Sequence, residues 1–326
     1  MGAYHLSLNN LFRKGYAVYQ AYLPKQEAAL RERRQVKRLR YLADELGLSD
    51  PIVIVDIGAN PLDFDAPYKA LMKADLCTVV GFEPQKEAFD TLQSNKSASE
   101  FYINEAVGNG ETLPFYQYES DGLSSLFKLD PKARHVFSWL ENPEGVAYNL
   151  VSDSEAATKR VDDIAEIKQI DFLKIDIQGG ELAVFQNARQ KMAKTIAVQT
   201  EMRWCKIYEN EPHFGEVDVE LNEQGFEMHC LYSAPQSKFM PHSQSKHIHW
   251  SAARQLIDED FIYVRALRDL EQQDPVFLKK LAILADAVFD SVDLVFQCLD
   301  ILAKMDEAPK NLAKKYRQSL PFNYLK

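Results

Sequence analysis

The sequence predicts an α/β fold built on a seven-stranded, mostly parallel sheet that helices cover on both faces. Short apolar segments alternate with helical stretches from Pro51 onward. Two of these segments, IVIVDIG and FLKIDI, are nearly continuous apolar runs that end in an acid, which is typical of central strands buried on both faces. The expected strands are Ile52–Ile57, Cys77–Phe82, Phe101–Val107, Asp171–Ile177, Thr195–Glu201, Phe226–Leu231 and Phe261–Arg265.

Helical additions are expected on both sides of this sheet domain. Residues 9–46 carry apolar side chains at three- and four-residue steps, and Gly47 is a plausible end of that helix. Beyond Asp274 two apolar stripes predict a helix pair that packs on the core or on a second copy of the chain, so any homo-oligomer is expected to form through these helices. We therefore expect an N-terminal helical segment (residues 1–50), a central domain (51–270) and a C-terminal helical extension (271–326).

The region between the third and fourth strands does not have the pattern of a simple crossover helix. Within residues 112–164 the segments TLPFYQY, SSLFKL and KRVDDI each resemble a short extended piece. A hairpin or meander is the structure expected there.

Composition restricts the class of protein further. The chain has 326 residues, of which 46% are apolar, and 38 Lys and Arg stand against 48 Asp and Glu for a net charge of -10. Nucleic-acid binding is therefore not expected without a local basic patch, and RERRQVKRLR (residues 31–40) is either such a patch or an ordinary solvated helix face. No run of about 18 apolar residues and no signal-peptide pattern is present, and the four cysteines form no C-x-x-C pair. We expect a cytoplasmic protein with reduced thiols and no membrane span.

A candidate cofactor site follows the first two strands. In Val55-Asp56-Ile57-Gly58-Ala59-Asn60 an apolar strand enters a turn at a glycine, which allows a ligand to approach the backbone closely. The next strand ends in Glu83, a carboxylate suited to accept hydrogen bonds from a ribose diol, and Pro84 ends that strand. An ordinary turn with an exposed Glu remains the alternative.

Two common classes of nucleotide site do not match this turn. The G-x-G-x-x-G of dinucleotide enzymes is absent, since Asn60 and Asp63 stand at the matching places, and no P-loop occurs. A mononucleoside-type cofactor without a pyrophosphate, such as S-adenosylmethionine, does not need either pattern.

The fourth strand carries the candidate chemistry. It ends in Asp176, and Glu181 begins the helix that follows. An acid at such a strand end can orient a hydroxyl, remove its proton or bind a metal, whereas Glu181 is equally suited to complement the start of the helix. The [DN]-P-P-[YF] that is common in enzymes that methylate base amines is replaced by Asp-Ile-Gln-Gly, which disfavours base methylation.

Taken together, these segments resemble the FkbM-type methyltransferases. The resemblance rests on VDIGAN, VVGFEP, NEAVGN, RVDDI, DFLKIDIQGGELAVFQNA, AVQTEM and PHFGEVDVELNEQGF, in that order, over about Pro51 to Leu231. It implies a class I methyltransferase (Rossmann-like) fold, S-adenosylmethionine as methyl donor with S-adenosylhomocysteine as product, and methylation of a hydroxyl on a sugar, glycan or related small metabolite.

The resemblance also implies roles for individual residues. It places Asp56, Gly58, Ala59 and Asn60 beside the methionine part of the donor, Glu83 on the ribose next to Pro84, Ala106 and Val107 near the adenine, and Asp176 near the transferring methyl. In two places the chain departs from the family pattern: Gln178 stands where a Glu is usual, and Pro61 and Leu62 replace a second glycine. A methyltransferase-fold binding or assembly protein with weakened turnover is therefore the alternative function, and an RNA methyltransferase is a third.

Other side chains complete the predicted site. A base is needed to remove the proton of the acceptor hydroxyl, and Asp176 is the first candidate, Glu201 the second and His213 the third. The candidate substrate-binding residues are Glu181, Trp204, His247 and His249. The two histidines are expected to belong to a polar lid with Trp250 rather than to a metal site, because no cysteine pair joins them.

Overall fold

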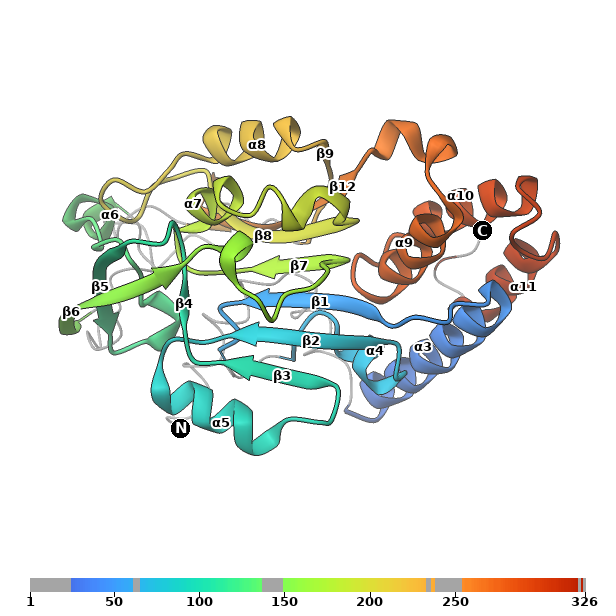
Figure 1. Ribbon diagram of the computed structural model, residues 1–326, viewed down its shortest axis with the longest axis horizontal. Coiled ribbons are helices and arrows are strands. Elements are labelled where there is room, and N and C mark those ends of the chain that lie inside the picture. The colour runs from blue at the N-terminus through green and yellow to red at the C-terminus, as the bar shows by residue number, and fades with distance from the viewer. Residues whose placement is uncertain are drawn as a thin grey trace, which may run out of the picture.

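The structure is a computed structural model that describes residues 25–60, 65–136, 149–232, 236–237, 254–321 and 324. Its centre is a seven-stranded sheet in the order β3-β2-β1-β7-β8-β12-β9. Strands β1, β2, β3, β7 and β8 pair in parallel, and β12 runs antiparallel between β8 and β9. The α/β fold class predicted from the sequence is thereby confirmed (Figure 1). The strands are β1 (Ile52–Ile57), β2 (Cys77–Phe82), β3 (Glu100–Ile103), β7 (Phe172–Ile175), β8 (Ala197–Arg203), β9 (Phe226–Leu231) and β12 (Asp258–Arg265).

Helices cover both faces of this sheet. The helices of the described residues are α3 (Lys25–Leu46), α4 (Lys69–Lys73), α5 (Lys86–Asn95), α6 (Pro131–Val136), α7 (Glu181–Gln186), α8 (Phe214–Glu223), α9 (Pro275–Ala287), α10 (Val292–Lys304) and α11 (Leu312–Ser319). The sheet separates two hydrophobic cores. Alternate side chains of β1 belong to different cores, because neighbouring side chains of a strand point to opposite faces. Ile54 lies in the core shared with α3, α4 and α9–α11, whereas Val55 lies in the core shared with α7 and α8.

The N-terminal helix ends as the sequence predicts. Leu39, Leu42 and Leu46 are buried at helical spacing, which fixes one face of α3 against the core. Gly47 has a φ of +60°, and the N–H of Leu48 donates to the carbonyl of Ala43 at 3.0 Å, closing the end of the helix. The part of the expected helix before Lys25 lies outside the described residues.

The C-terminal helices pack on the sheet domain. Almost every residue of α9 from Phe277 onward is buried, and α9 and α3 are joined by Arg38, whose guanidinium donates to both carboxylate oxygens of Asp286 at 2.6 and 2.8 Å. Tyr316 of α11 donates to the same carboxylate at 2.7 Å. Docking of these helices on the core is what the apolar stripes predicted. The structure adds α11, which the sequence analysis missed. Oligomerisation through these helices and the three-part division of the chain stay predictions.

The insertion between β3 and β7 contains the expected hairpin but differs from the expected strands in two ways. The third expected strand is broken, because it ends at Ile103 and β4 (Ala106–Val107) pairs instead with β6 (Leu150–Lys159). β6 was missed because its mostly exposed, polar sequence lacks an apolar alternation. The hairpin itself is present, since β5 (Thr112–Tyr118) pairs with β6 in antiparallel.

The other two expected extended pieces of this region are wrong. SSLFKL forms only isolated bridges, and in KRVDDI the chain leaves β6 and enters the 3₁₀ turn η2 (Val161–Asp163). The remaining short elements are η1 (Asp121–Leu123), η3 (Lys191–Lys194), η6 (Leu267–Gln272), β10 (Gln236–Ser237) and β11 (Gln255–Leu256). None of the helices in these described stretches is long and apolar enough to cross a membrane.

Candidate functional site

The ends of β1, β2 and β7 surround a cavity of about 430 Å³. Ligands of open α/β sheets bind at this edge, and the volume falls in the range of roughly 300–1,000 Å³ that is usual for small-molecule sites. The cavity is lined by all eight residues that the sequence analysis assigned to the cofactor, namely Asp56, Gly58, Ala59, Asn60, Glu83, Pro84, Ala106 and Val107. Asp176, the first candidate base, lines it as well. The structure therefore brings the donor-side candidates and the candidate base into one hollow.

The turn after β1 has a geometry that only glycine satisfies. Gly58 has a φ of +81°, and a Cβ at this position would lie 2.1 Å from the carbonyl oxygen of Asp176. The N–H groups of Gly58 and Ala59 both donate to the carbonyl of Phe82, each at 3.0 Å. The turn is thus fixed against the ends of both neighbouring strands, and its position is set by backbone contacts.

A buried ion pair lies at the end of β1. The Lys174 ammonium is 3.2 Å from Asp56 and donates to the carbonyl of Gly58 at 3.0 Å, and Tyr68 donates to Asp56 at 2.6 Å. Burial alone would lower the pKa of Lys174, but the carboxylates of Asp56, Asp176 and Asp260 raise it above its ordinary value. Burial, with Asp56 beside it, raises the pKa of Tyr68 well above the usual range. Both groups remain protonated, so neither can serve as the base.

Glu83, which the sequence analysis predicts to bind a ribose, is a buried residue of the cavity lining. Its side chain is 2% exposed and lines the cavity, and its carboxylate accepts a hydrogen bond from the N–H of Gln85 at 2.8 Å. Asn104 donates to the carbonyl of Glu83 at 2.8 Å, which ties the end of β2 to the chain after β3. An ionised carboxylate has several acceptor positions, so this contact is compatible with additional hydroxyl donors.

Gln199 adds a polar group that the sequence analysis did not single out. It is 2% exposed and lines the cavity, and within the described residues its side-chain oxygen has no hydrogen-bond partner. Because an unsatisfied buried acceptor is costly, this oxygen is suited to a donor on a bound molecule. Its position directly after the apolar residues Ile196, Ala197 and Val198 was the only signal for it.

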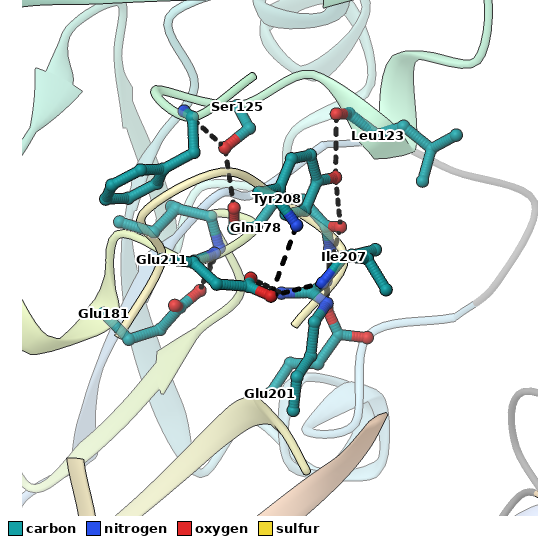
Figure 2. A network of polar contacts seen from close by, with 12 residues as sticks. Leu123, Ser125, Gln178, Glu181, Glu201, Ile207, Tyr208 and Glu211 are labelled. Carbon is teal, nitrogen blue, oxygen red and sulfur yellow. Dashed lines mark hydrogen bonds and ion pairs between the residues drawn. The ribbon is translucent and has the colours of Figure 1, made fainter. Parts of the chain in front are cut away.

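Beside the cavity, Gln178 is the centre of a polar network (Figure 2). Its side-chain NH₂ group donates to Asp176 at 2.7 Å and to Glu201 at 2.6 Å. Its side-chain oxygen accepts from Arg203 at 2.7 Å and from the Tyr208 hydroxyl at 3.1 Å. The network connects the first and second candidate bases through one amide.

Arg203 is the only cation that the structure shows inside this network among the described residues. It donates to Glu201 at 2.8 Å, lies 3.7 Å from Glu211 and stacks over the ring of Tyr208 at 5.2 Å. Burial alone would lower its pKa, but Glu201, Tyr208 and Glu211 raise it, so the guanidinium stays charged. The acidic groups around it are therefore partly compensated inside the protein.

Glu181 lies beneath the turn, away from the cavity lining. Its carboxylate accepts from the N–H of Ile177 at 3.0 Å and of Gly179 at 3.2 Å, and the side chain is buried. This position favours the interpretation that Glu181 closes the turn before α7 over the interpretation that it binds substrate.

We expect stability to depend on the ionisation of Glu181. Burial raises its pKa to about 6 from 4.5, so the folded state holds a proton that the unfolded chain releases. The free energy of unfolding should therefore fall by about 2 kcal/mol as the pH rises through this window. Glu181→Gln, which keeps the accepting oxygen, should remove this fall. Urea unfolding at a pH below 4.5 and at a pH above 6 measures this fall in the free energy of unfolding. An equal fall in Glu181→Gln and wild type would contradict the assignment.

The remaining predicted site residues lie elsewhere. Trp204 packs against Phe214 and Phe261, with ring centroids 6.3 and 5.0 Å away, so it contributes to the core. His213 is exposed at the start of α8, outside the cavity lining, and its N–H donates to Glu216 at 2.7 Å. His247 and His249 lie outside the described residues, as does Leu62. Within the described residues no group of three or more His, Cys, Asp or Glu side chains could hold a metal ion.

Comparison with solved structures finds distant likenesses. The chain is similar to magnesium protoporphyrin IX methyltransferase from Synechocystis PCC 6803 with bound SAM, at 8% identity over 80% of this chain and 96% of that one, with a TM-score of 0.36. It is also similar to precorrin-6y C5,15-methyltransferase from Geobacter metallireducens GS-15, at 10% identity over 70% and 88% of the chains and a TM-score of 0.31. We draw no argument about substrate from such distant likenesses. No curated protein matches the chain at a significant level.

The sequence match is more informative. The model of the family described as "Methyltransferase FkbM domain" matches residues 56–228, more than half of the chain. That range runs from the acid at the end of β1, through the Glu83 strand and the Asp176 strand, to β9. The chain therefore belongs to the FkbM methyltransferase family.

Proposed function

We propose that the chain transfers a methyl group from S-adenosylmethionine to a hydroxyl oxygen of a sugar, glycan or related small metabolite. The observation that carries this proposal is the position of Asp176. Its carboxylate lines the same cavity as the eight donor-side residues, at the strand end where the reacting group of a ligand is expected. A base and a donor site in one cavity are what O-methylation requires.

The residues present fit an adenosyl cofactor. Glu83 offers a buried carboxylate for the ribose hydroxyls, and Ala106 and Val107 offer a small apolar surface for the adenine. Asp56 and the Gly58 turn lie where the methionine part would be held. When bound, S-adenosylmethionine supplies an electrophilic methyl group on a positively charged sulfur.

The role of the protein is to orient the acceptor and to take its proton. A hydroxyl becomes a good nucleophile only as its proton leaves, so a base must lie within hydrogen-bond reach. Asp176 would accept this proton, and a bound S-adenosylmethionine would supply the methyl group to the acceptor oxygen, with S-adenosylhomocysteine as the leaving group. Much of the acceleration then comes from holding the two reactants in line.

The charge of the cavity favours a neutral acceptor. Seven lining side chains are acidic, whereas the two lysines are Lys69, paired with Asp65 at 2.6 Å, and the buried Lys174. A phosphorylated or carboxylated acceptor would meet this negative field without an available cation among the described lining residues. The hydrogen-bond acceptor on Gln199 also suits the hydroxyl groups of a polyol.

We expect Glu83→Ala to weaken binding of S-adenosylhomocysteine. Loss of a buried carboxylate that accepts the ribose hydroxyls should cost about 1–3 kcal/mol of binding free energy. Isothermal titration calorimetry measures it, with Glu87→Ala on the exposed face of α5 as the control. Unchanged affinity in Glu83→Ala would contradict the position assigned to the ribose.

The proposed function is tested by methyl transfer. The purified chain is incubated with donor labelled in the methyl group and a panel of neutral sugars and short glycans, and labelled product is separated by chromatography. Label in a sugar that is stable to base supports an O-methyl ether. Tight binding of S-adenosylhomocysteine without transfer to any member of the panel would favour the alternative of a binding or assembly protein.

The structure gives little support to RNA as the acceptor. Of the basic run at residues 31–40, Arg38 is buried against Asp286, and Arg40 donates to Asp75 at 2.7 Å and to the carbonyl of Lys73 at 2.8 Å. Two cations of the basic run that this alternative needs are therefore already paired with carboxylates of the same chain.

A further inference from the structure

The polar network beside the cavity contains an arrangement that needs an explanation. One side-chain NH₂ group, that of Gln178, donates to two carboxylates, Asp176 and Glu201. Two carboxylates that face the same small volume repel each other, and proteins usually relieve this with a shared proton or a bound cation. Here an uncharged amide fills that position.

The orientation of this amide is fixed by its partners. Arg203 can only donate and the ionised carboxylates can only accept, so the oxygen of Gln178 must face Arg203 and the NH₂ group must face Asp176 and Glu201. The side chain is buried, at 6% exposed, which protects these bonds from water. The amide therefore has one stable setting.

The backbone of Gln178 is also held in place by its surroundings. Its φ is +61°, in the left-handed region that residues other than glycine, asparagine and aspartate rarely adopt. The hydroxyl of Ser125, from the insertion, donates to the Gln178 carbonyl at 2.7 Å and holds this conformation (Figure 2). Strained backbone that is held by its surroundings is frequent at functional sites.

We propose that Gln178 is the positioning residue of the transfer site, where its amide takes the place of a cation or shared proton between Asp176 and Glu201 and directs the Asp176 carboxylate toward the acceptor. This inference rests on the proposed function. A neutral donor orients the carboxylate and leaves it a charged base, whereas a bound cation would reduce its basicity and a shared proton would occupy it. We therefore expect that methyl transfer needs no divalent cation between these two carboxylates.

The test without acceptor compares two matched variants. Gln178→Glu places a third carboxylate between Asp176 and Glu201, whereas Gln186→Glu makes the same change on the exposed end of α7. The charged and titratable groups that contact Gln178 or its arginine partner are Asp176, Glu201, Arg203, Tyr208 and Glu211, and they are common to both variants. The melting temperature of Gln178→Glu should be roughly 5 °C or more lower at pH 8 than at about pH 5.5, because three neighbouring carboxylates are stable only when they hold a proton. Gln186→Glu should not show this fall.

Added Mn²⁺ gives a second readout of the same site. Millimolar Mn²⁺ should restore the melting temperature of Gln178→Glu at high pH and should leave wild type and Gln186→Glu unchanged. The proposal is overturned if Gln178→Glu and Gln186→Glu have the same melting temperature at both pH values and Mn²⁺ changes neither. In that case the amide does not separate the two carboxylates.

The catalytic arm uses a sugar that the wild type methylates, with Gln178→Asn as a further variant that keeps an amide but is one methylene shorter. We expect kcat to fall about tenfold or more in Gln178→Asn and about a hundredfold in Gln178→Glu, with the acid limb of the pH–rate profile moved upward in the latter. Affinity for S-adenosylhomocysteine should change less than twofold in both, and chelators should leave wild-type activity intact. A loss of melting temperature with kcat and the pH profile preserved would mean a merely structural role.

The two proposals fail in different ways. If no sugar is methylated, the proposed function falls and the melting experiments alone decide whether Gln178 separates the carboxylates. If sugars are methylated and both variants keep the wild-type pH profile, only the positioning role falls.

Discussion

Asp176→Asn should lower kcat by about 10²- to 10⁴-fold, the usual contribution of a positioned base. The variant keeps the shape of the side chain. It also keeps an oxygen that can accept the hydrogen bond that the Gln178 amide donates to Asp176 at 2.7 Å in the wild type. The negative charge, and with it the ability to take a proton, is lost. Single-turnover rates with an accepted sugar measure the effect on the chemical step.

Donor affinity separates this role from a simpler one. If Asp176 only held the donor, Asp176→Asn would weaken binding of S-adenosylhomocysteine and leave the rate at saturation unaffected. Asp90→Asn on the exposed face of α5 removes the same charge away from the cavity and serves as control. A variant with normal kcat would transfer the role of base to Glu201, the second candidate, which the same amide contacts at 2.6 Å.

Gly58→Ala should abolish donor binding and destabilise the fold. The new Cβ would lie 2.1 Å from the carbonyl oxygen of Asp176, so the turn after β1 or the end of β7 must move. Overpacking of this kind costs about 1–3 kcal/mol, and the left-handed φ of +81° adds about 1–2 kcal/mol for a residue with a Cβ. Both movements displace residues that line the cavity.

Gly215→Ala is the matched control for this prediction. Gly215 lies in the first turn of α8, and a Cβ there would meet no atom within 4 Å. This variant should be neutral or more stable by up to about 1 kcal/mol. Denaturant unfolding and calorimetry with S-adenosylhomocysteine compare the two variants, and equal stability of Gly58→Ala and wild type would show that the turn is less constrained than the contacts indicate.

The elements predicted correctly from the sequence are those with strong local signals. β1, β2 and β9 have the expected bounds. β1 and β2 are largely apolar runs between turn-forming or charged residues, and β9 alternates apolar residues with Glu227 and His229. The polar strand β6 was missed because it lacks the apolar periodicity on which such predictions depend. The eight-residue helix α11 lies in the expected helical extension but was not separated from the two apolar stripes before it. β4 was placed in the wrong strand because its pairing with β6 involves residues about fifty positions away.

The candidate site divides in the same way. Asp56, Gly58, Glu83 and Asp176 stand at strand ends, where the order of a parallel sheet already implies that they meet. Lys174 and Gln199 were visible only as polar residues in apolar strands. Core packing, the ordinary alternative to substrate binding for Trp204, is what the structure shows. Sequence spacing gave no indication that Gln178 contacts two carboxylates and an arginine.

By itself, the sequence determined the α/β fold, the cavity edge and the residues that line the donor side, because alternation of apolar strands and helices leaves one arrangement of strand ends. Only the tertiary structure decided which polar groups are paired with one another. Hydrogen bonds such as those of Gln178 join residues from β7, β8 and the following loop, and their lengths depend on how the sheet is twisted and packed. For this reason the family was visible in the linear sequence, whereas the positioning of its candidate base was not.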